Sequence, residues 1–306
     1  MRLSYTKNGD NMKYDNALSL IGNTPLVRLG NTNMYAKMEK YNLTGSIKDR
    51  AALKIIEEGI KEQKINEETT IIEATSGNMG ISLACICKIK KLKCIIVMPD
   101  NMSKERIQLL KAYGADVILT NSTMGMEGAI CKVKELEKEK DNVFVVSQFD
   151  NYNSVLAHYY STSQEIISEL KGVDCVIVGM GTGGTIIGIS KYLKQQNKNI
   201  HIIGVEPSAS PLISLGSAGP HKIQGIGPNF IPSIIDKKMI DEIISITDDE
   251  AYEGTKELVD TYGLFVGVSS GAVYKAGLKV MNKYHNIVLI FPDGGERYLS
   301  VAGLIW

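Results

Sequence analysis

Short apolar runs alternate with longer amphipathic stretches along the chain after Tyr14. The runs are rich in β-branched residues and bounded by turn residues, which is typical of strands buried on both faces. We predict strands at residues 70–74, 94–98, 116–120, 143–147, 175–179, 200–205 and 287–291. Amphipathic stretches between them, at residues 104–113, 126–140 and 249–262, predict helices. This alternation indicates an α/β fold in which helices connect the strands of mainly parallel sheets.

Capping residues mark several of the predicted helix ends. Ser103 precedes one helix, and Asp248 with Asp249 precedes another, where side-chain oxygens can bind free backbone N–H groups. Gly114 and Gly263 follow apolar helical stretches, and glycine readily adopts the left-handed conformation that ends many helices.

The length of 306 residues suits two domains. We expect two three-layer αβα domains, a large one formed by residues 13–45 and 150–306 and a small one formed by residues 46–149. A long irregular stretch at residues 208–232 carries four Pro and four Gly, and such loops in compact domains usually serve function. The first eleven residues have no apolar periodicity, so Met12 is an alternative to Met1 as the native start.

Composition and charge exclude several classes of protein. The 34 basic and 34 acidic side chains cancel, which disfavours a nucleic-acid partner. No apolar run is long enough to span a membrane, and the first residues carry no signal-peptide core. Five cysteines without a CxxC pair suit buried thiols in a reducing compartment. We therefore expect a cytoplasmic enzyme that binds neither membranes nor nucleic acids.

The first motif is Cys175-Val-Ile-Val-Gly-Met-Gly-Thr-Gly-Gly-Thr185, in which a buried strand leads into glycines and then into a helix that begins at Thr185. Free N–H groups and the positive end of the helix dipole make such a junction a phosphate site. Gly179, Gly181 and Gly184 also satisfy G-x-G-x-x-G, and Glu206 follows after the next strand. A dinucleotide-binding loop is therefore one alternative, and a tight turn that needs glycine only for packing is another.

The second motif is Asn42-Leu-Thr-Gly-Ser-Ile-Lys-Asp-Arg50, a polar loop that leads into an amphipathic helix with Lys48 in its first turn. One lysine on a helix is uninformative by itself. Beside a carbonyl cofactor, however, a desolvated amine readily forms a Schiff base.

The third motif, Glu73-Ala-Thr-Ser-Gly-Asn-Met-Gly80, also joins a strand to a helix. Thr75, Ser76 and the following backbone amides are suited to bind a carboxylate. Asn78 is suited to bind a phenolic oxygen, although it is also a common helix cap. The fourth motif, Gly267-Val-Ser-Ser-Gly-Ala272, precedes a helix, where a serine N-cap is an equally good interpretation.

These four motifs, in this order and at these separations, resemble those of the fold-type II pyridoxal phosphate (PLP) enzymes, which have a tryptophan synthase β-like fold. Within them, the chain is similar to the cysteine synthases (O-acetylserine sulfhydrylases) and to their relatives the cystathionine β-synthases. The similarity covers nearly the whole chain. It includes Ile21-Gly-Asn-Thr-Pro-Leu-Val-Arg-Leu29, Met98-Pro-Asp-Asn-Met-Ser-Lys-Glu-Arg106, Gln148-Phe149, Ala157-His-Tyr159, Gly219-Pro-His-Lys-Ile-Gln-Gly-Ile-Gly227, Phe291-Pro-Asp-Gly294 and Arg297-Tyr-Leu-Ser300.

The resemblance implies pyridoxal 5'-phosphate as cofactor, with Lys48 as the Schiff-base lysine and no metal. It implies that Asn78 binds the ring oxygen of the cofactor and that Ser269 binds its pyridine nitrogen. The implied phosphate-binding residues are Gly181, Thr182, Gly183, Gly184 and Thr185. The implied substrate-binding residues are Thr75, Ser76, Asn78, Met79, Gln148 and Gly227. The dinucleotide interpretation explains only one of the four motifs and is not pursued.

Residue chemistry agrees with a β-replacement reaction. A serine at the pyridine nitrogen donates a neutral hydrogen bond and does not stabilise a pyridinium as a carboxylate would. The ring is then a weak electron sink, and loss of a β-leaving group is favoured. Lys48 is the group expected to remove the α-proton. We predict β-elimination to an aminoacrylate, followed by addition of a nucleophile.

Departures from the family pattern concern the substrate. Met79 stands where threonine is usual, and Pro228-Asn229 stands where Ala-Gly is common. We expect closure of the loop at residues 75–80 on a substrate carboxylate to bring residue 79 near the β-substituent, where Met79 favours a thiol-leaving donor over O-acetylserine. On this hypothesis, Met79→Thr raises the preference for O-acetylserine. Asn229 is expected near the leaving group.

Our first prediction is O-acetyl-L-serine plus sulfide giving L-cysteine plus acetate. An alternative uses L-cysteine as donor, releasing hydrogen sulfide and forming L-serine, lanthionine or cystathionine. A non-catalytic regulatory relative is a third alternative, against which the presence of Lys48 argues. The resemblance also implies a homodimer and serine acetyltransferase as a partner.

Overall fold

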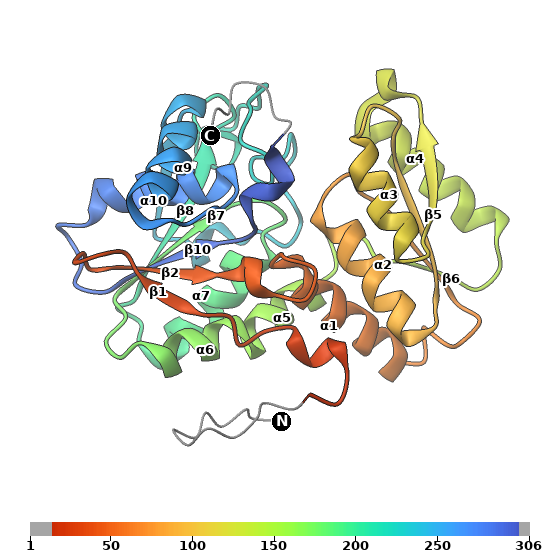
Figure 1. The fold of residues 1–306 in the computed structure, drawn as a ribbon, viewed down its shortest axis with the longest axis horizontal. Coiled ribbons are helices and arrows are strands. Elements are labelled where there is room, and N and C mark those ends of the chain that lie inside the picture. Colours follow the sequence, from red (N-terminus) through yellow and green to blue (C-terminus); the bar gives the residue numbers. More distant parts are fainter. Residues whose placement is uncertain (1–13, 300–306) are drawn as a thin grey trace.

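The computed structural model describes residues 14–299. Its larger sheet has the strand order β1-β2-β10-β7-β8-β9 (Figure 1). β1 is antiparallel to β2, and all other neighbours in this sheet are parallel. The strands are β1 (Leu26–Arg28), β2 (Met34–Met38), β7 (Cys175–Gly179), β8 (His201–Pro207), β9 (Glu242–Ile246) and β10 (Ile287–Phe291).

The smaller sheet has the order β5-β4-β3-β6, and all its strands are parallel. Its strands are β3 (Thr70–Ala74), β4 (Lys93–Pro99), β5 (Asp116–Thr120) and β6 (Val143–Val145). The two sheets lie in opposite halves of the molecule (Figure 1). An α/β fold with mainly parallel sheets is thereby confirmed.

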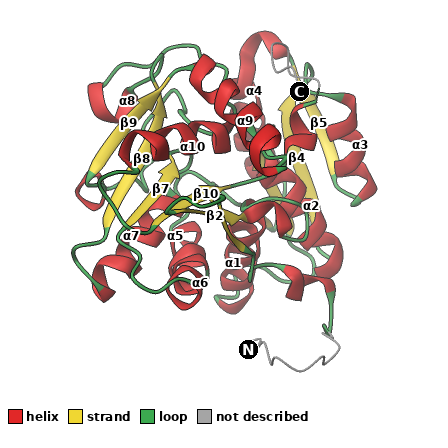
Figure 2. Cartoon of the chain, turned by 60° about the vertical axis from the view of Figure 1, so that its left-hand side comes forward, coloured by secondary structure: helices red, strands yellow, loops and turns green. Residues whose placement is uncertain are grey.

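Helices cover both faces of each sheet. The α-helices are α1 (Lys48–Lys61), α2 (Asn78–Lys90), α3 (Lys104–Ala112), α4 (Gly125–Glu139), α5 (Asn153–Tyr160), α6 (Thr162–Glu169), α7 (Gly184–Gln196), α8 (Leu212–Leu215), α9 (Asp248–Tyr262) and α10 (Val268–Val280). Short 3-10 helices span Ala17–Leu20, Glu39–Tyr41, Ser122–Met124, Lys237–Met239 and Gly295–Tyr298. Figure 2 shows α9 and α10 on one side of the larger sheet and α5, α6 and α7 on the other.

The apolar cores follow these layers. Alternate residues of β7 point to opposite faces, so Cys175 and Ile177 pack with α9 and α10 whereas Val176 and Val178 pack with α5, α6 and α7. In the smaller sheet, Ile71 packs in the core shared with α1, α2 and α3, and its neighbour Ile72 packs toward α4. Each sheet is therefore the middle layer of an αβα arrangement.

Most predicted elements occur where the sequence placed them. β3, β5, β7 and β10 match the predicted bounds, whereas β6 ends at Val145. β1, β2 and β9 were not predicted. Gly114 and Gly263 have φ values of +83° and +66°, as expected for helix ends.

One capping prediction is wrong. Ser103 does cap α3 by accepting the N–H of Arg106, but the N-cap of α9 is Thr247. Thr247 and Glu250 form a reciprocal capping box there, which leaves Asp248 and Asp249 inside the first turn.

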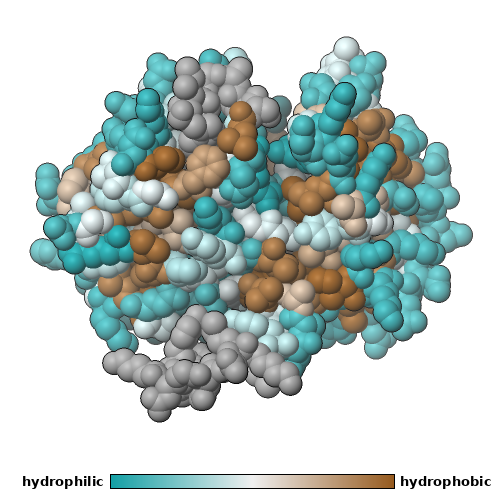
Figure 3. Space-filling view, in the orientation of Figure 1, coloured by the Kyte–Doolittle hydropathy of each residue, from teal (hydrophilic) through white to brown (hydrophobic). Residues whose placement is uncertain are grey.

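Hydrophobic residues occur on the face drawn in Figure 3 as separate patches between hydrophilic ones. Within residues 14–299, no helix has both the length and the apolar composition to cross a membrane. The choice between Met1 and Met12, residue 13, and residues 300–306 all fall outside the described residues. The division into domains at residues 46 and 149 stays a prediction.

Candidate active site

The glycine-rich loop connects β7 to α7 and forms one wall of a pocket. Its backbone is tightly constrained, because a Cβ at Gly181 would lie 2.5 Å from the carbonyl oxygen of Gly225. Gly183 has a φ of +90° and caps α7, which begins at Gly184, one residue earlier than predicted. The loop therefore presents backbone N–H groups and the hydroxyls of Thr182 and Thr185 at the start of a helix, which is a favourable place for an anion.

Lys48 is the first residue of α1, and the loop before it is held from two directions. The backbone N–H of Ile47 donates to the carbonyl of Pro292 at 2.8 Å, which attaches the loop to the segment after β10. Buried Asp49 accepts from the N–H of Thr44 at 2.6 Å and from the hydroxyl of Ser82 in α2 at 2.6 Å. The start of α1 is thereby fixed between the two sheets.

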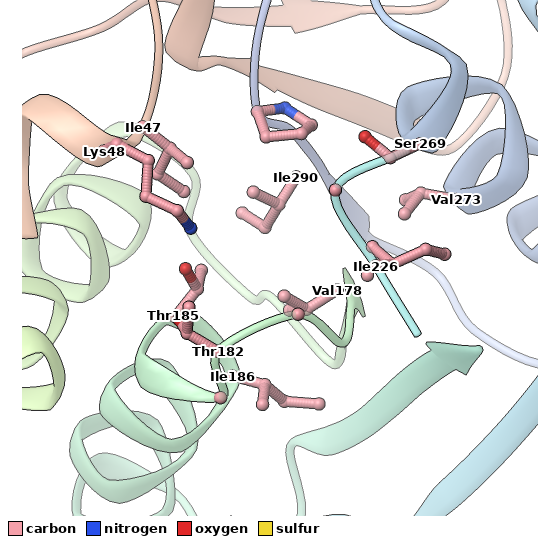
Figure 4. A pocket seen from close by; sticks show the side chains of 15 residues that line it. Ile47, Lys48, Val178, Thr182, Thr185, Ile186, Ile226, Ser269, Val273 and Ile290 are labelled. Atoms are coloured by element: carbon pink, nitrogen blue, oxygen red, sulfur yellow. The ribbon is translucent and has the colours of Figure 1, made fainter. Parts of the chain in front are cut away.

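The side chain of Lys48 enters the same pocket, where its Nζ projects toward the loop carrying Thr182 and Thr185 (Figure 4). Burial lowers the pKa of Lys48 from its ordinary value, and the nearby negative charge of Asp293 opposes this effect. A lowered pKa increases the neutral fraction of the amine, which is the nucleophilic form.

Thr185 is linked to a buried histidine. Its Oγ1 lies 3.2 Å from Nε2 of His158, and Nδ1 of His158 lies 2.9 Å from Oγ1 of Thr162. Burial lowers the pKa of His158 well below its ordinary value, and the positive charges of Arg50 and Lys48 act in the same direction. A neutral imidazole thus holds the Thr185 hydroxyl at the edge of the pocket.

Ser269 lies across the pocket from Lys48, in the first turn of α10 (Figure 4). The N-cap of this helix is Gly267, so the alternative interpretation of this motif as a serine N-cap is wrong. Gly267 is required there, because a Cβ at this position would lie 2.1 Å from Oδ1 of Asp293.

Asn78 begins α2, whose N-cap is Gly77, so its side chain is not a helix cap. Its Nδ2 donates to Oδ2 of Asp293 at 2.6 Å, and its Oδ1 accepts from Arg297 at 2.5 Å. Burial raises the pKa of Asp293, although hydrogen bonds from Tyr298 and Asn78 and the charge of Arg297 oppose this effect.

Thr75 and Ser76 form the loop between β3 and α2. Thr75 is buried, and its hydroxyl accepts the N–H of Gly77 at 3.2 Å. The carbonyl of Ser76 accepts a hydrogen bond from the guanidinium of Arg106 in α3. These contacts hold the loop in a defined shape in front of α2.

The side chain of Met79 packs in the apolar core and is not among the residues that line the pocket. It is only 2% exposed and packs in the core between α1, α2, α3 and the smaller sheet. Met79 is the second residue of α2, and its side chain points into this core, away from the loop at residues 75–77. Met79 therefore has only its backbone N–H available for a ligand at the start of α2.

Neither Gln148 nor Gly227 is among the residues that line the pocket. Gln148 is buried, and its backbone N–H donates to Glu73 at 3.4 Å. Gly227 has a φ of +64°, and its carbonyl is hydrogen-bonded to His221 at 2.8 Å. Gly225, two residues earlier, is the glycine of this loop that lines the pocket.

The structure thus brings many of the predicted residues into one place. Pocket-lining residues among them are Lys48, Gly181, Thr182, Gly183, Thr185 and Ser269. Among the others, Gly184 begins α7 next to Gly183, Asn78 is hydrogen-bonded to Asp293, and Thr75, Ser76, Met79, Gln148 and Gly227 do not line the pocket. Roles for Asp293, Arg297 and His158 were missed, although each lies in a segment that carries the family resemblance.

The family of pyridoxal-phosphate dependent enzymes matches residues 17–293. This chain belongs to that family. It is 46% identical over 292 residues to cysteine synthase B of Campylobacter jejuni, covering 94% of this chain and 97% of that protein. Cofactor and enzyme class are as the sequence predicted.

Solved structures agree with this assignment. Cysteine synthase from Entamoeba histolytica superposes with a TM-score of 0.93 at 39% identity, covering 98% of this chain and 93% of that one. A hydrogen sulfide-producing enzyme from Fusobacterium nucleatum superposes with a TM-score of 0.89 at 46% identity, covering 94% and 100%.

The residues of this pyridoxal-phosphate dependent enzyme fit its cofactor. The pocket offers an amine for the aldehyde, a glycine-rich loop at a helix start for the phosphate and a serine hydroxyl for the ring nitrogen. Glu206, the acid of the dinucleotide interpretation, is 1% exposed and accepts from the N–H of Ile213 at 3.1 Å and from Ser214. Its carboxylate is therefore engaged in the loop after β8 rather than free to bind a ribose.

Proposed function

We propose that this protein catalyses β-replacement on a β-substituted L-alanine, in which O-acetyl-L-serine and sulfide give L-cysteine and acetate. The observation that carries this proposal is that Lys48, four residues of the glycine-rich segment (Gly181, Thr182, Gly183 and Thr185) and Ser269 line one pocket. The similarity to cysteine synthases supports the choice of reaction.

Each wall of the pocket would hold one part of the cofactor. The backbone N–H groups at residues 181–185 and the hydroxyls of Thr182 and Thr185 would bind the phosphate. Ser269 would donate to the ring nitrogen, and Asn78 would donate to the phenolic oxygen. The hydrogen bond between Thr185 and neutral His158 supports this arrangement, because it orients the threonine hydroxyl.

Lys48 would perform two tasks. Bound pyridoxal phosphate withdraws electrons from the α-carbon of an amino acid and so acidifies the α-proton. Lys48 would bond covalently to the cofactor and, once displaced by the substrate amine, would accept that proton at Nζ. The lowered pKa of Lys48 supports this role, because more of the amine is neutral. Neutral Ser269 supports departure of the β-substituent directly after proton loss.

The loop between β3 and α2 would bind the substrate carboxylate. Thr75, Ser76, Asn78 and the backbone N–H of Met79 lie at or before the first turn of α2, where the helix dipole attracts an anion. Gln148 would complete this site, and Gly227 would lie beside the bound amino acid. Asn229, in the same loop as Gly227, would lie near the leaving group.

A second candidate reaction uses L-cysteine as the donor and releases hydrogen sulfide. Water, a second cysteine or homocysteine would then add to give L-serine, lanthionine or cystathionine. The observation that favours it is the 46% identity to a hydrogen sulfide-producing enzyme over 94% of this chain.

Product identification from a substrate panel tests these reactions. We expect purified protein with O-acetyl-L-serine and sulfide to give L-cysteine and acetate, and Lys48→Ala to give neither. Sulfide release from L-cysteine that exceeds cysteine synthesis would favour the second reaction. Turnover of neither donor, by protein that binds pyridoxal phosphate, would contradict both and favour a non-catalytic relative.

The remaining proposals follow from the resemblance alone. We infer a large domain of residues 13–45 and 150–306 and a small mobile domain of residues 46–149 that carries the carboxylate loop. We also infer a cytoplasmic homodimer that binds serine acetyltransferase. Chromatography coupled to light scattering, with and without serine acetyltransferase, tests the assembly state and the partner.

A further inference from the structure

The side-chain amide of Asn78 is held by two charged residues from a distant part of the chain. Its Nδ2 donates to Oδ2 of Asp293 at 2.6 Å, and its Oδ1 accepts from the guanidinium of Arg297 at 2.5 Å. Asn78 begins α2, which connects β3 and β4 of the smaller sheet, whereas Asp293 and Arg297 follow β10 of the larger sheet. The contacts therefore join the carboxylate loop of one half to the core of the other.

These two partners fix the orientation of the amide. A side-chain amide has one oxygen, which accepts, and one nitrogen, which donates two N–H groups. Rotating it by half a turn would place its oxygen against the carboxylate of Asp293 and its nitrogen against the guanidinium of Arg297. Both contacts would be repulsive, so a single orientation is stable. In this orientation, one N–H of Asn78 is bound to Asp293 and the other is available to a ligand.

Asp293 is itself held firmly. Its side chain is 2% exposed, and its Oδ2 also accepts from the hydroxyl of Tyr298 at 2.6 Å. An isolated β-bridge pairs Asp293 with Ser46, two residues before Lys48. Its other oxygen, Oδ1, has no hydrogen-bond partner within residues 14–299. A buried carboxylate with an unpaired oxygen destabilises the fold, so its presence beside Asn78 and Lys48 indicates a role in the site.

We propose that Asp293, together with Arg297, is a positioning residue that orients the amide of Asn78 so that its second N–H faces the phenolic oxygen of the cofactor. This inference rests on the proposed function, in which Asn78 binds that oxygen. Asp293 and Arg297 act through Asn78 and need not touch the cofactor themselves.

A double-mutant cycle on cofactor affinity tests the proposal. Cofactor-free protein is titrated with pyridoxal phosphate, and the dissociation constant is read from absorbance for wild type, Asp293→Ala, Asn78→Ala and the double variant. We expect Asp293→Ala to weaken binding about three- to tenfold, the value of one hydrogen bond, when Asn78 is present. In the Asn78→Ala background, Asp293→Ala should change affinity less than twofold. Any effect of Asp293 on Lys48 occurs in both backgrounds and cancels.

Two further variants sharpen the cycle. Asp293→Asn keeps an acceptor for Asn78 and should recover most of the affinity. Glu296→Gln, an exposed neighbour of Asp293, is the matched control and should bind like wild type. If Asp293→Ala does not fold, Arg297→Met replaces it in the same cycle, because it frees the oxygen of Asn78.

The thermal midpoint of each cofactor-free variant separates positioning from stability. A merely structural role lowers the midpoint and weakens binding equally in both backgrounds, which would overturn the proposal. An affinity of Asp293→Ala equal to that of Glu296→Gln would also overturn it. Failure of wild-type protein to bind pyridoxal phosphate would instead contradict the proposed function itself.

Discussion

The backbone N–H of Ser147 donates to Oε2 of Glu73 at 2.9 Å, which joins the segment after β6 to the end of β3. Glu73 also accepts the N–H of Gln148 at 3.4 Å and is 4% exposed. Ser147 has a φ of +53°, in the left-handed region that non-glycine residues rarely adopt. The carboxylate of Glu73 therefore holds the backbone turn that presents Gln148. Burial raises the pKa of Glu73 to about 7, although these hydrogen bonds oppose the effect.

This pKa predicts a pH dependence of stability. The ordinary value is 4.5, so the folded protein holds the Glu73 proton more tightly than the unfolded chain does. The contribution of Glu73 is fully present below about pH 4.5 and is lost as the pH rises through about 7. We expect wild type to lose on the order of 3 kcal/mol across this window relative to Glu73→Gln. Urea unfolding at several pH values measures the difference.

The control for this experiment is Glu67→Gln, at an exposed position just before β3. Its stability should follow that of wild type at every pH. Parallel curves for wild type and Glu73→Gln would show that Glu73 does not titrate in this range.

Strands made of uninterrupted apolar residues were predictable from the sequence. Strands that contain a charged residue were harder to recognise, and β2 shows why. β10 is buried at every position and reads as a strand from its sequence. β2 contains Lys37, which interrupts the apolar pattern although its side chain is fully buried. Its Nζ donates to the carbonyl of Thr24 at 2.6 Å and to Glu169 at 2.9 Å. Partners supplied by other elements make this burial possible, and no local pattern reveals them.

The site divides in the same way. The glycine-rich loops and the start of α1 have local signals, but only the family resemblance implied that they meet in one pocket. Asn78 and Asp293 are 215 residues apart and meet only when both sheets have formed. The direction of the Met79 side chain depends on how α2 packs against its neighbours, which the motif does not contain.

We predict that Lys48→Ala loses covalently bound cofactor, because no other amine of the described residues lines the pocket. The phosphate loop remains, so the variant should bind pyridoxal phosphate reversibly. Lys54→Ala is the control, since Lys54 lies on the same helix and pairs with Glu58 at 2.7 Å. Borohydride reduction followed by mass spectrometry locates the attached cofactor. Covalent attachment in Lys48→Ala at wild-type level would disprove the assignment.

Gly181→Ala should weaken cofactor binding by at least about tenfold. The added Cβ would lie 2.5 Å from the carbonyl oxygen of Gly225, so the loop backbone must move away from its anion-binding shape. Leu215→Ala is the control, because Leu215 is 77% exposed and does not line the pocket. Equilibrium dialysis measures the affinity of each protein. Equal affinities for Gly181→Ala and wild type would mean that this loop does not bind the phosphate.

Ser269→Ala should keep its cofactor but bind it more weakly, by about 0.5–1.5 kcal/mol, the value of one neutral hydrogen bond. Ser269→Asp introduces a negative charge beside the ring nitrogen and should favour the protonated ring. We expect this variant to release the β-substituent more slowly in single-turnover experiments. A rate for Ser269→Asp equal to that of wild type would contradict the argument that a neutral partner favours elimination.

The variant Met79→Thr tests whether the side chain of Met79 serves packing in the core or selection of the donor substrate. Its side chain is 2% exposed among the apolar residues of α1, α2 and α3, so Met79→Thr removes packing and buries a hydroxyl. We expect this variant to lose about 2–4 kcal/mol of stability in urea unfolding. Met124→Thr, at a position that is 57% exposed, should lose far less. Because the Met79 side chain points away from the loop, the ratio of kcat/KM for O-acetylserine over cysteine should stay unchanged. A ratio that rises in Met79→Thr without loss of stability would instead place this side chain beside the β-substituent and make it a determinant of the donor.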